Sequence, residues 1–517
     1  MKKISNILLI ILILVQPILD NYIMYYNPSL ELFGFKYSTI IRYMLIFLMG
    51  IIILYKTKAK KWRKTIILYS ILLFIYAIGH HLNAQNFTSL NPNGIGYSFL
   101  EEMLYISRYI IPLIIIYYIN SIEIDKNLLK KTIILYSLAI SSLVIISNIF
   151  YFAKASYSNV AIEYNIIDWF IKDINYLYAA SKGIFYSTSI ITTLLIVTPY
   201  IFSLYYKENK LIYLTAIVFN MLALFMVGTR ACTYGFIIIS VLMLIMYIFF
   251  SVLKKNIKFE LKHVITSIFI ICLSFFILQY SPTSQRVGTM KIANGDIKNP
   301  DKQNPNNIVN LEDQKTSNQN IEELKQIVNS DSSNKEEQII SFISKNKSYL
   351  GIYAPFLDCY SFEHDYIFWT NIIINEPVYN KNSNRYIEEQ MLKRVKEINN
   401  NKLDNLFGIT YSRTSKVFNL ERDFLYQYYS MGIIGVLILI FPLLYFLITS
   451  IIKILIKKDY FNLKNCSLCL GIGLIFGVAL YSGDVLDNVG TVTIIGVILG
   501  MLVENTSKKD EDKIKKV

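Results

Sequence analysis

The sequence is poor in the residues that build metal centres and disulfide frameworks. It has four histidines, none in a pair with metal-ligand spacing, and five scattered cysteines. Cys466 and Cys469 stand in an apolar stretch without a second cysteine pair or a histidine pair, so we interpret them as packing residues. Glu-x-Asp triplets occur at 363–365 and 421–423, but such triplets are common by chance. We therefore expect no metal, no cofactor and no disulfide framework.

The sequence also lacks a glycine-rich loop that could cradle phosphate, and it lacks a cytoplasmic domain that could hold a nucleotide. These absences argue against ATP hydrolysis and against chemistry on nucleotide sugars. Charged residues make up only 17% of the 517 residues, whereas 54% are hydrophobic, and the mean hydropathy is +0.41. This composition excludes a soluble globular protein and indicates an integral membrane protein.

Twelve apolar runs approach the roughly 20 residues that a helix needs to cross about 30 Å of hydrocarbon. They span residues 7–26, 38–55, 65–82, 103–119, 132–152, 184–206, 211–227, 231–253, 264–280, 424–452, 465–481 and 486–503. The first run follows a charged start, as in a secretory signal, but no small-residue cleavage site follows it. We interpret it as a retained first helix, so the sequence predicts an all-α polytopic membrane protein of about twelve transmembrane helices.

Lysine and arginine are distributed unevenly between the short loops. With the N-terminus inside, the cytoplasmic segments carry 26 of these residues and the opposite short loops carry 5. Because basic loops resist translocation, we predict that both termini lie in the cytoplasm. The net charge of +14 is then a signal of topology and gives no indication of nucleic-acid binding.

One long insertion of 143 residues, 281–423, is predicted on the outer side, with 18 basic and 19 acidic residues. Its part 291–347 is rich in Asn, Lys, Asp, Gln and Ser, so we expect it to stay flexible apart from short helices. Aromatic residues return from 348 onward, which predicts a small folded cap over the membrane in 348–423, or a helix lying on the membrane surface. The predicted parts are helices 1–9 in 1–280, the extracytoplasmic loop in 281–423, helices 10–12 in 424–503 and a cytoplasmic tail in 504–517.

The predicted topology confines charged residues from distant stretches to one outer interfacial layer. Arg230 lies between the seventh and eighth spans, Arg286 follows the ninth, and Glu421, Arg422 and Asp423 precede the tenth. An arginine fork fits phosphate oxygens, and a nearby carboxylate can accept a proton from an attacking hydroxyl. The alternative is that each charge only anchors a helix end. The convergence of these residues favours a reaction site.

Other polar residues of the apolar runs have simpler interpretations. Arg42 lies near the outer end of the second span, where it can snorkel to the interface. His80 and His81 lie at the outer end of the third span, where interfacial packing is favoured over catalysis. Glu101 and Arg108 are about two helical turns apart on one face, so they are reserve candidates for a polar cavity.

Four stretches carry a resemblance to a known family: QPILD in the first helix, GTRACTYGF after the seventh, LFGITYSR at 406–413 and ERDFLYQYYSMGIIG leading into the tenth. The chain resembles the O-antigen polymerase and ligase superfamily of bacterial membrane glycosyltransferases, particularly its Gram-positive capsular and teichuronic-acid-type members. The resemblance implies a GT-C-like helical fold in the bacterial cell membrane. It also implies metal-independent glycan transfer from a polyprenyl (undecaprenyl) diphosphate to a glycan acceptor on the outer face.

The resemblance extends to single residues. Arg230 and Arg286 match the arginines with which the family grips phosphate. Many members have a histidine at the start of a pattern like HNDFL, and Glu421 stands in its place here. The base is therefore left open between Glu421 and Asp423, and Arg422 either grips phosphate or tunes these carboxylates.

We therefore expect an outer-face polymerase of lipid-linked oligosaccharide repeats, which builds a surface polysaccharide such as a capsule. Its partners would be the lipid-linked glycan donor, the glycan acceptor and the bilayer, with a flippase and a chain-length regulator as candidate partner proteins. A ligase that passes glycan to a different cell-envelope acceptor would use the same residues. A flippase or transporter would explain the helices equally well, but not the long outer cap.

Overall fold

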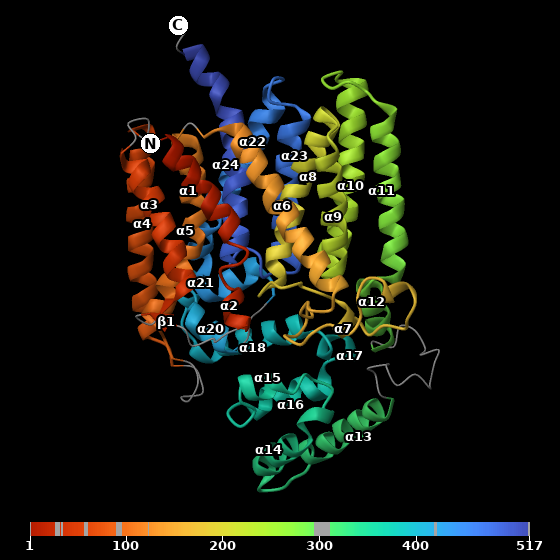
Figure 1. Cartoon of the computed structure of the whole chain (residues 1–517). Helices are drawn as coiled ribbons and strands as arrows, with labels where there is room; N and C mark the ends of the chain where they lie inside the picture. The colour runs from red at the N-terminus through yellow and green to blue at the C-terminus, as the bar shows by residue number, and fades with distance from the viewer. Residues whose placement is uncertain are drawn as a thin grey trace. The chain divides into compact units, whose positions relative to one another are not determined.

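The computed structural model describes residues 2–25, 31–32, 35–55, 60–88, 96–122, 124–293, 311–417 and 421–514. These ranges are mostly helical (Figure 1), and their two-residue strands β1 (Glu31–Leu32) and β2 (Phe35–Lys36) form one antiparallel pair. The helices up to residue 293 are α1 (Lys2–Val15), α2 (Asn21–Tyr25), α3 (Tyr37–Tyr55), α4 (Lys60–Gln85), α5 (Phe99–Ser121), α6 (Lys126–Ile149), η2 (Asp168–Phe170), α7 (Tyr176–Ala179), α8 (Thr188–Glu208), α9 (Leu211–Met226), α10 (Arg230–Ile248), η3 (Phe249–Leu253), α11 (Leu261–Tyr280) and α12 (Pro282–Ala293). The later helices are α13 (Leu311–Val328), α14 (Lys335–Asn346), η4 (Lys347–Tyr349), α15 (Pro355–Cys359), α16 (Tyr366–Asn375), α17 (Val378–Lys381), α18 (Asn384–Asn399), α19 (Asp404–Phe407), α20 (Tyr411–Val417), α21 (Asp423–Leu439), α22 (Phe441–Ile456), α23 (Leu463–Tyr481) and α24 (Val489–Ile514).

The chain folds into two compact units. Unit 1 comprises Met1–Tyr69, Ile106–Gln285 and Leu439–Val517. Unit 2 comprises Ser70–Tyr105 and Arg286–Ile438. Unit 2 therefore combines a short stretch near the N-terminus with the long insertion, which sequence order alone keeps far apart.

Among the described residues, nine helical stretches are long and apolar enough to cross a membrane. They are Tyr37–Tyr55, Lys64–Gln85, Lys126–Ile149, Thr188–Glu208, Arg230–Leu253, Leu261–Tyr280, Asp423–Ile456, Leu463–Tyr481 and Val489–Ser507. Helix α1 has 14 residues and α9 has 16, which is short of the roughly 20 that a full crossing needs. The chain is thus an all-α polytopic membrane protein, while the number twelve and the orientation stay predictions.

Helix α8 forms the centre of unit 1, and all its residues from Ser189 to Tyr206 are buried. A helix that is apolar on every side is stable only when other helices surround it. Helix α23 approaches it closely at Gly471, where a Cβ would lie 2.3 Å from the carbonyl oxygen of Ile196. The buried Asn220 amide is paired on both sides: it donates to Thr198 at 3.0 Å and accepts from Ser137 at 2.8 Å.

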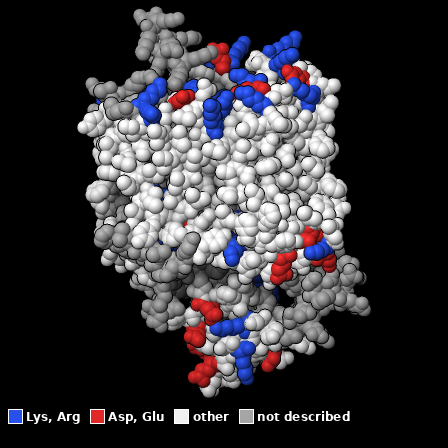
Figure 2. All heavy atoms as spheres, viewed as in Figure 1, with Lys and Arg blue, Asp and Glu red and all other residues white. Residues whose placement is uncertain are grey.

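The outer surface of the unit 1 helices is apolar. On the face in Figure 2, Lys, Arg, Asp and Glu gather at the helix ends, and the surface between them shows almost none of these side chains. An apolar band flanked by charged ends is the pattern that a bilayer requires.

The cap of unit 2 has a hydrophobic core of its own around Trp369, which is fully buried. The segment expected to stay flexible apart from short helices contains α13 and α14, and Leu324, Ile339 and Ile343 of these helices are buried in the cap. The Trp369 indole donates to the carbonyl of Tyr360 at 2.7 Å. Residues 294–310 of that segment lie outside the described ranges.

Helix α21 is broken in its middle. Gly432 has φ 68° and ψ 178°, which is far from helical geometry. The carbonyl of Met431, just before the break, accepts a hydrogen bond from the Tyr76 hydroxyl at 2.8 Å. A side chain of unit 2 thus satisfies a backbone group at the interruption.

Candidate functional site

Backbone hydrogen bonds join two chain segments within unit 2. The N–H groups of Ile409 and Thr410 donate to the carbonyls of Tyr429 and Ser430 at 2.8 and 2.9 Å. These carbonyls lie in the turn of α21 that precedes its break, so the pairing satisfies groups at the interruption. It also joins LFGITYSR to ERDFLYQYYSMGIIG, two of the four stretches that carry the resemblance.

Two glycines allow the segments to approach this closely. A Cβ at Gly408 would lie 2.2 Å from the carbonyl oxygen of Ser430, and one at Gly432 would lie 2.3 Å from that of Leu406. Both glycines also have a positive φ, 80° and 68°, which side chains disfavour. Backbone contact and backbone conformation thus require glycine at both positions.

The backbone of Thr410, two residues after Gly408, is strained. Its φ is +80°, which is an outlier for a β-branched residue, and its side chain is fully buried. The Asn83 amide holds the adjoining backbone by donating to the Gly408 carbonyl at 3.1 Å and to Asp404 at 2.9 Å. Strain of this kind persists only where surrounding contacts enforce it, and it clusters at functional sites.

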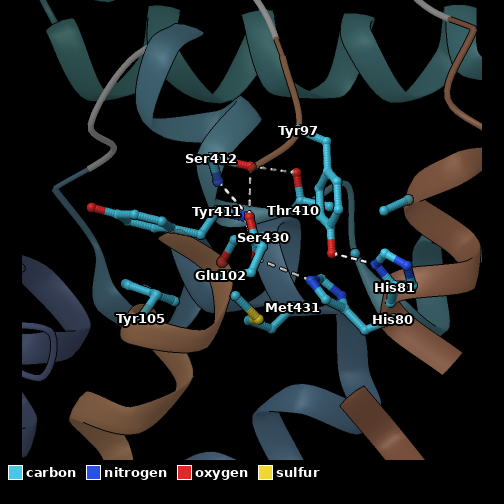
Figure 3. Close-up of polar contacts among 12 residues, drawn as sticks. His80, His81, Tyr97, Glu102, Tyr105, Thr410, Tyr411, Ser412, Ser430 and Met431 are labelled. Atoms are coloured by element: carbon cyan, nitrogen blue, oxygen red, sulfur yellow. Dashed lines mark hydrogen bonds and ion pairs between the residues drawn. The ribbon is translucent and has the colours of Figure 1, made fainter. Parts of the chain in front are cut away.

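A buried ionisable pair anchors the same segment (Figure 3). Nε2 of His80 lies 3.0 Å from Oε2 of Glu102, and neither side chain has exposed surface. Glu102 also accepts hydrogen bonds from the Tyr411 N–H at 3.1 Å and from the Ser412 N–H and hydroxyl at 2.6 and 2.8 Å. On its other side, His80 Nδ1 lies 2.6 Å from the Phe407 carbonyl. The pair therefore holds both ends of residues 407–412.

The geometry fixes how many protons the pair holds. A carbonyl oxygen only accepts, so Nδ1 of His80 carries a proton toward Phe407. Nε2 and Oε2 then share one further proton, either as an imidazolium beside a carboxylate or as a neutral imidazole that accepts from a carboxylic acid. In both forms the Glu102 carboxyl group remains available to cap the start of α20.

Arg413, the residue after Ser412 in α20, is a third buried ionisable side chain beside His80 and Glu102. Its guanidinium carbon lies 4.1 Å from the ring centre of Phe87 and 5.5 Å from that of Tyr97, and Nη2 donates to the Ala84 carbonyl at 3.0 Å. Its Nε and Nη1 find no acceptor among the residues that the structure describes. Burial lowers the pKa of Arg413. Burial and the charge of Glu102 raise the pKa of Tyr97 to about 12, so Tyr97 stays a neutral hydroxyl.

The three predicted residues at the start of α21 lie beside cap helix α18. Arg385 donates to Oε2 of Glu421 at 2.7 and 3.1 Å, and Arg422 donates to Glu389 at 3.2 Å. The side chain of Glu421 is half exposed, whereas Asp423 is 5% exposed in the first turn of the helix. A carboxylate in the first turn is favoured by the helix dipole.

The two predicted arginines lie in different units. Arg230 is exposed at the start of α10 in unit 1, where the Thr229 hydroxyl caps the helix by accepting from the Cys232 N–H. Arg286 lies half-buried in α12 and belongs to unit 2 with Glu421 and its neighbours. The roles of all five predicted residues remain predictions.

Sequence reasoning did not anticipate the roles of several residues. His80 was interpreted as packing, and Glu102 and Arg413 were not singled out. Their signal was weak: Glu102 is one of two adjacent glutamates, and its neighbour Glu101 is exposed. Arg42, interpreted as snorkelling, is 7% exposed and pairs with Asp20 in the QPILD stretch at 2.5 Å.

Within the described ranges, no three His, Cys, Asp or Glu side chains are arranged to hold a metal ion.

Comparison with known proteins gives the same result as the resemblance of the motifs. No curated protein matches the chain. A family model, in contrast, covers residues 2–509, and thus both units. The chain belongs to the family of O-antigen ligase like membrane proteins.

Proposed function

We propose that the protein is an outer-face glycosyltransferase that polymerises polyprenyl-diphosphate-linked repeats into a surface polysaccharide. Membership of the O-antigen ligase-like family supports membrane glycan transfer in general. The observation that carries the proposal is the contact between the two motif stretches at 406–413 and 421–435. Their shared hydrogen bonds join a strained, buried segment to helix α21, which begins at Asp423 directly after Glu421 and Arg422.

In the proposed reaction, the acceptor hydroxyl attacks the anomeric carbon of the donor sugar. The new glycosidic bond forms as the bond from that carbon to the diphosphate oxygen breaks, and polyprenyl diphosphate leaves with the electron pair. Glu421 or Asp423 takes the proton of the attacking hydroxyl. Arg230 and Arg286 stabilise the charge on the departing diphosphate, and no nucleotide is needed because the activated bond arrives on the carrier.

The two candidate bases, Glu421 and Asp423, differ in their surroundings. Two donors of Arg385 converge on Oε2 of Glu421 and hold this carboxylate in one orientation. Asp423 is buried in the first turn of α21. Glu421 is the more accessible of the two to a bulky glycan hydroxyl.

The proposal is tested by single substitutions expressed in a strain without the native gene. Arg230→Ala and Glu421→Ala should abolish chain growth while membrane levels of the protein stay at the wild-type value. Glu322→Ala, at an exposed glutamate of the cap, is the matched control and should make normal polymer. Undiminished polymer in both of the first two variants would contradict the assignment.

A ligase remains the second candidate because the family description itself names one. It would pass a completed glycan to a different envelope acceptor with the same residues. The two differ in what accumulates on the carrier lipid when the protein is missing.

A further inference from the structure

Unit 1 contains a second cluster of charge, in residues 150–187 between α6 and α8. Lys154 and Lys182 adjoin the antiparallel bridge between Ala155 and Ser181, and their main chains are hydrogen-bonded to each other. The Lys182 N–H donates to the Lys154 carbonyl at 2.9 Å, and the Ser156 N–H donates to the Ala180 carbonyl at 2.9 Å. The positive charge of each lysine disfavours the charged form of the other.

Lys182 is nearly removed from solvent, with 6% of its surface exposed. Its ammonium donates to the Asn159 side chain at 2.9 Å, and no carboxylate among the described residues pairs with it. Burial, followed by the charge of Lys154, lowers the pKa of Lys182. Lys172 of the same segment shows the ordinary arrangement, because it is half exposed and pairs with Asp168 at 2.8 Å.

A buried ammonium with no counter-ion, facing a second lysine, costs free energy. An anion bound between the two ammonium groups offsets their repulsion and supplies the counter-ion that Lys182 lacks. The cluster is also open at one side, since Lys154 is half-buried and Asn159 is exposed. An oxyanion can thus approach from the surface.

The lysine pair is fixed against the turn that carries Arg230. The Ser181 N–H donates to the Met226 carbonyl at 2.7 Å, and the Tyr157 hydroxyl donates to the Gly228 carbonyl at 2.8 Å. A Cβ at Gly228 would lie 2.7 Å from the Cβ of Ala180, so the two backbones are in direct contact. The segment with the lysines and the turn before α10 therefore form one braced unit.

We propose that Lys154 and Lys182 form an oxyanion site for a phosphate group of a lipid. Lysine binds phosphate as a compact point charge, and two lysines suit a group with more than one negative charge. The phosphate can come from the diphosphate of a carrier lipid or from the headgroup of a membrane phospholipid. The first source rests on the proposed function, because it would extend the grip of Arg230 on the donor.

The test uses the full-length protein, purified into nanodiscs of neutral phosphatidylcholine and titrated calorimetrically with inorganic pyrophosphate. Lys182→Met should weaken binding about tenfold or more, which corresponds to the loss of one charge-assisted hydrogen bond. Lys154→Met should act in the same direction, and it is less exposed to folding defects because its side chain is only half-buried. Lys172→Met, from the same segment, is the matched control and should bind like wild type.

Pyrophosphate binding that is absent in wild type, or unchanged in both Lys182→Met and Lys154→Met, would overturn the inference. The two sources are separated by nanodiscs that contain anionic phosphatidylglycerol. If the headgroup is the natural ligand, this lipid weakens pyrophosphate binding to wild type but not to Lys182→Met; if the carrier is, it has no such effect. Because binding is read directly, normal polymer formation with unchanged binding would reject this site and leave the proposed function standing.

Discussion

The side chains of His80 and Glu102 meet at 3.0 Å, fully buried in unit 2. Their outer hydrogen bonds reach Phe407 on one side and Tyr411 and Ser412 on the other. A pair on α4 and α5 therefore sets the conformation of a loop more than 300 positions later. Substitution of either residue therefore tests whether the pair holds this loop in place.

Removal of Glu102 should destabilise the protein strongly. Glu102→Ala leaves the N–H groups of Tyr411 and Ser412 and the His80 ring without a partner, and breaking a buried pair costs about 3–5 kcal/mol. Glu102→Gln should cost less, because its carbonyl still accepts from Ser412 while its amide opposes the Tyr411 N–H. Thermal unfolding in detergent measures both, and exposed Glu101→Ala is the control.

The pair should also show strong coupling. His80→Ala and Glu102→Ala each strand the other partner, so the double variant should lose less stability than the sum of the single losses, with a coupling of about 0.5–3 kcal/mol. A double-mutant cycle measures this coupling from the unfolding free energies of wild type, the two single variants and the double variant. Additive losses would mean that the two groups do not interact as the structure shows.

Gly432 should tolerate no side chain. Gly432→Ala places a Cβ 2.3 Å from the Leu406 carbonyl and forces a residue with a side chain into a φ of 68°, so both pairing and stability should fail. Gly473→Ala in helix α23 is the matched control, because a Cβ there meets nothing within 4 Å. Alanine is a better helix former by about 1 kcal/mol, so the control should be neutral or stabilising. Limited proteolysis and unfolding midpoints of the two variants check the contrast.

Arg385 should matter more for activity than for stability. The Arg385–Glu421 pair is partly exposed, so Arg385→Ala should change unfolding free energy by about 1 kcal/mol or less. If the pair orients the catalytic carboxylate, polymer formation should nevertheless fall about tenfold or more, since loss of orientation acts on the rate. Lys325→Ala, in the exposed Lys325–Glu322 pair, is the control for a cap ion pair without a proposed role. Normal polymer formation by Arg385→Ala would show that Arg385 is not needed to orient Glu421 for the reaction.

The sequence predicted the fold class and the segments that matter better than it predicted the contacts. Apolar run length identified helices such as α8 and α10, because the bilayer imposes length and composition on any spanning helix. The run at 7–26 is not one helix: α1 ends at Val15 and α2 spans Asn21–Tyr25, because the chain turns at the QPILD stretch between them, where Asp20 pairs with Arg42. Hydropathy does not register such a turn.

The candidate site was predictable only where charge and position coincide. Glu421, Arg422 and Asp423 stand out because three charges adjoin an apolar run, yet their partners Arg385 and Glu389 come from a cap helix with no distinguishing motif. The His80–Glu102 pair depends on two helices meeting at one height, which local sequence does not encode. Thr410 adopts its strained backbone only because tertiary contacts enforce it.

Sidedness is the next prediction. In a cysteine-free background, Tyr353→Cys in the cap should react in intact cells with a membrane-impermeant maleimide, because residue 353 is 53% exposed and its loop is predicted outside. Lys210→Cys, in a short loop predicted inside, should react only after the cells are opened; the Lys210 side chain is 60% exposed, so access is not limiting. The opposite labelling pattern would invert the topology and remove the outer-face reaction.

The most direct measurement of the central claim is the state of lipid-linked glycans in cells that lack this protein. A polymerase leaves single repeats on the carrier, and these should be open to an impermeant glycan-modifying reagent added from outside. Glycan isolated from the carrier should then show one repeat and no longer chains. Long polymer retained on the carrier would instead indicate a ligase, and single repeats protected inside the cell would indicate a flippase; either result would contradict the account.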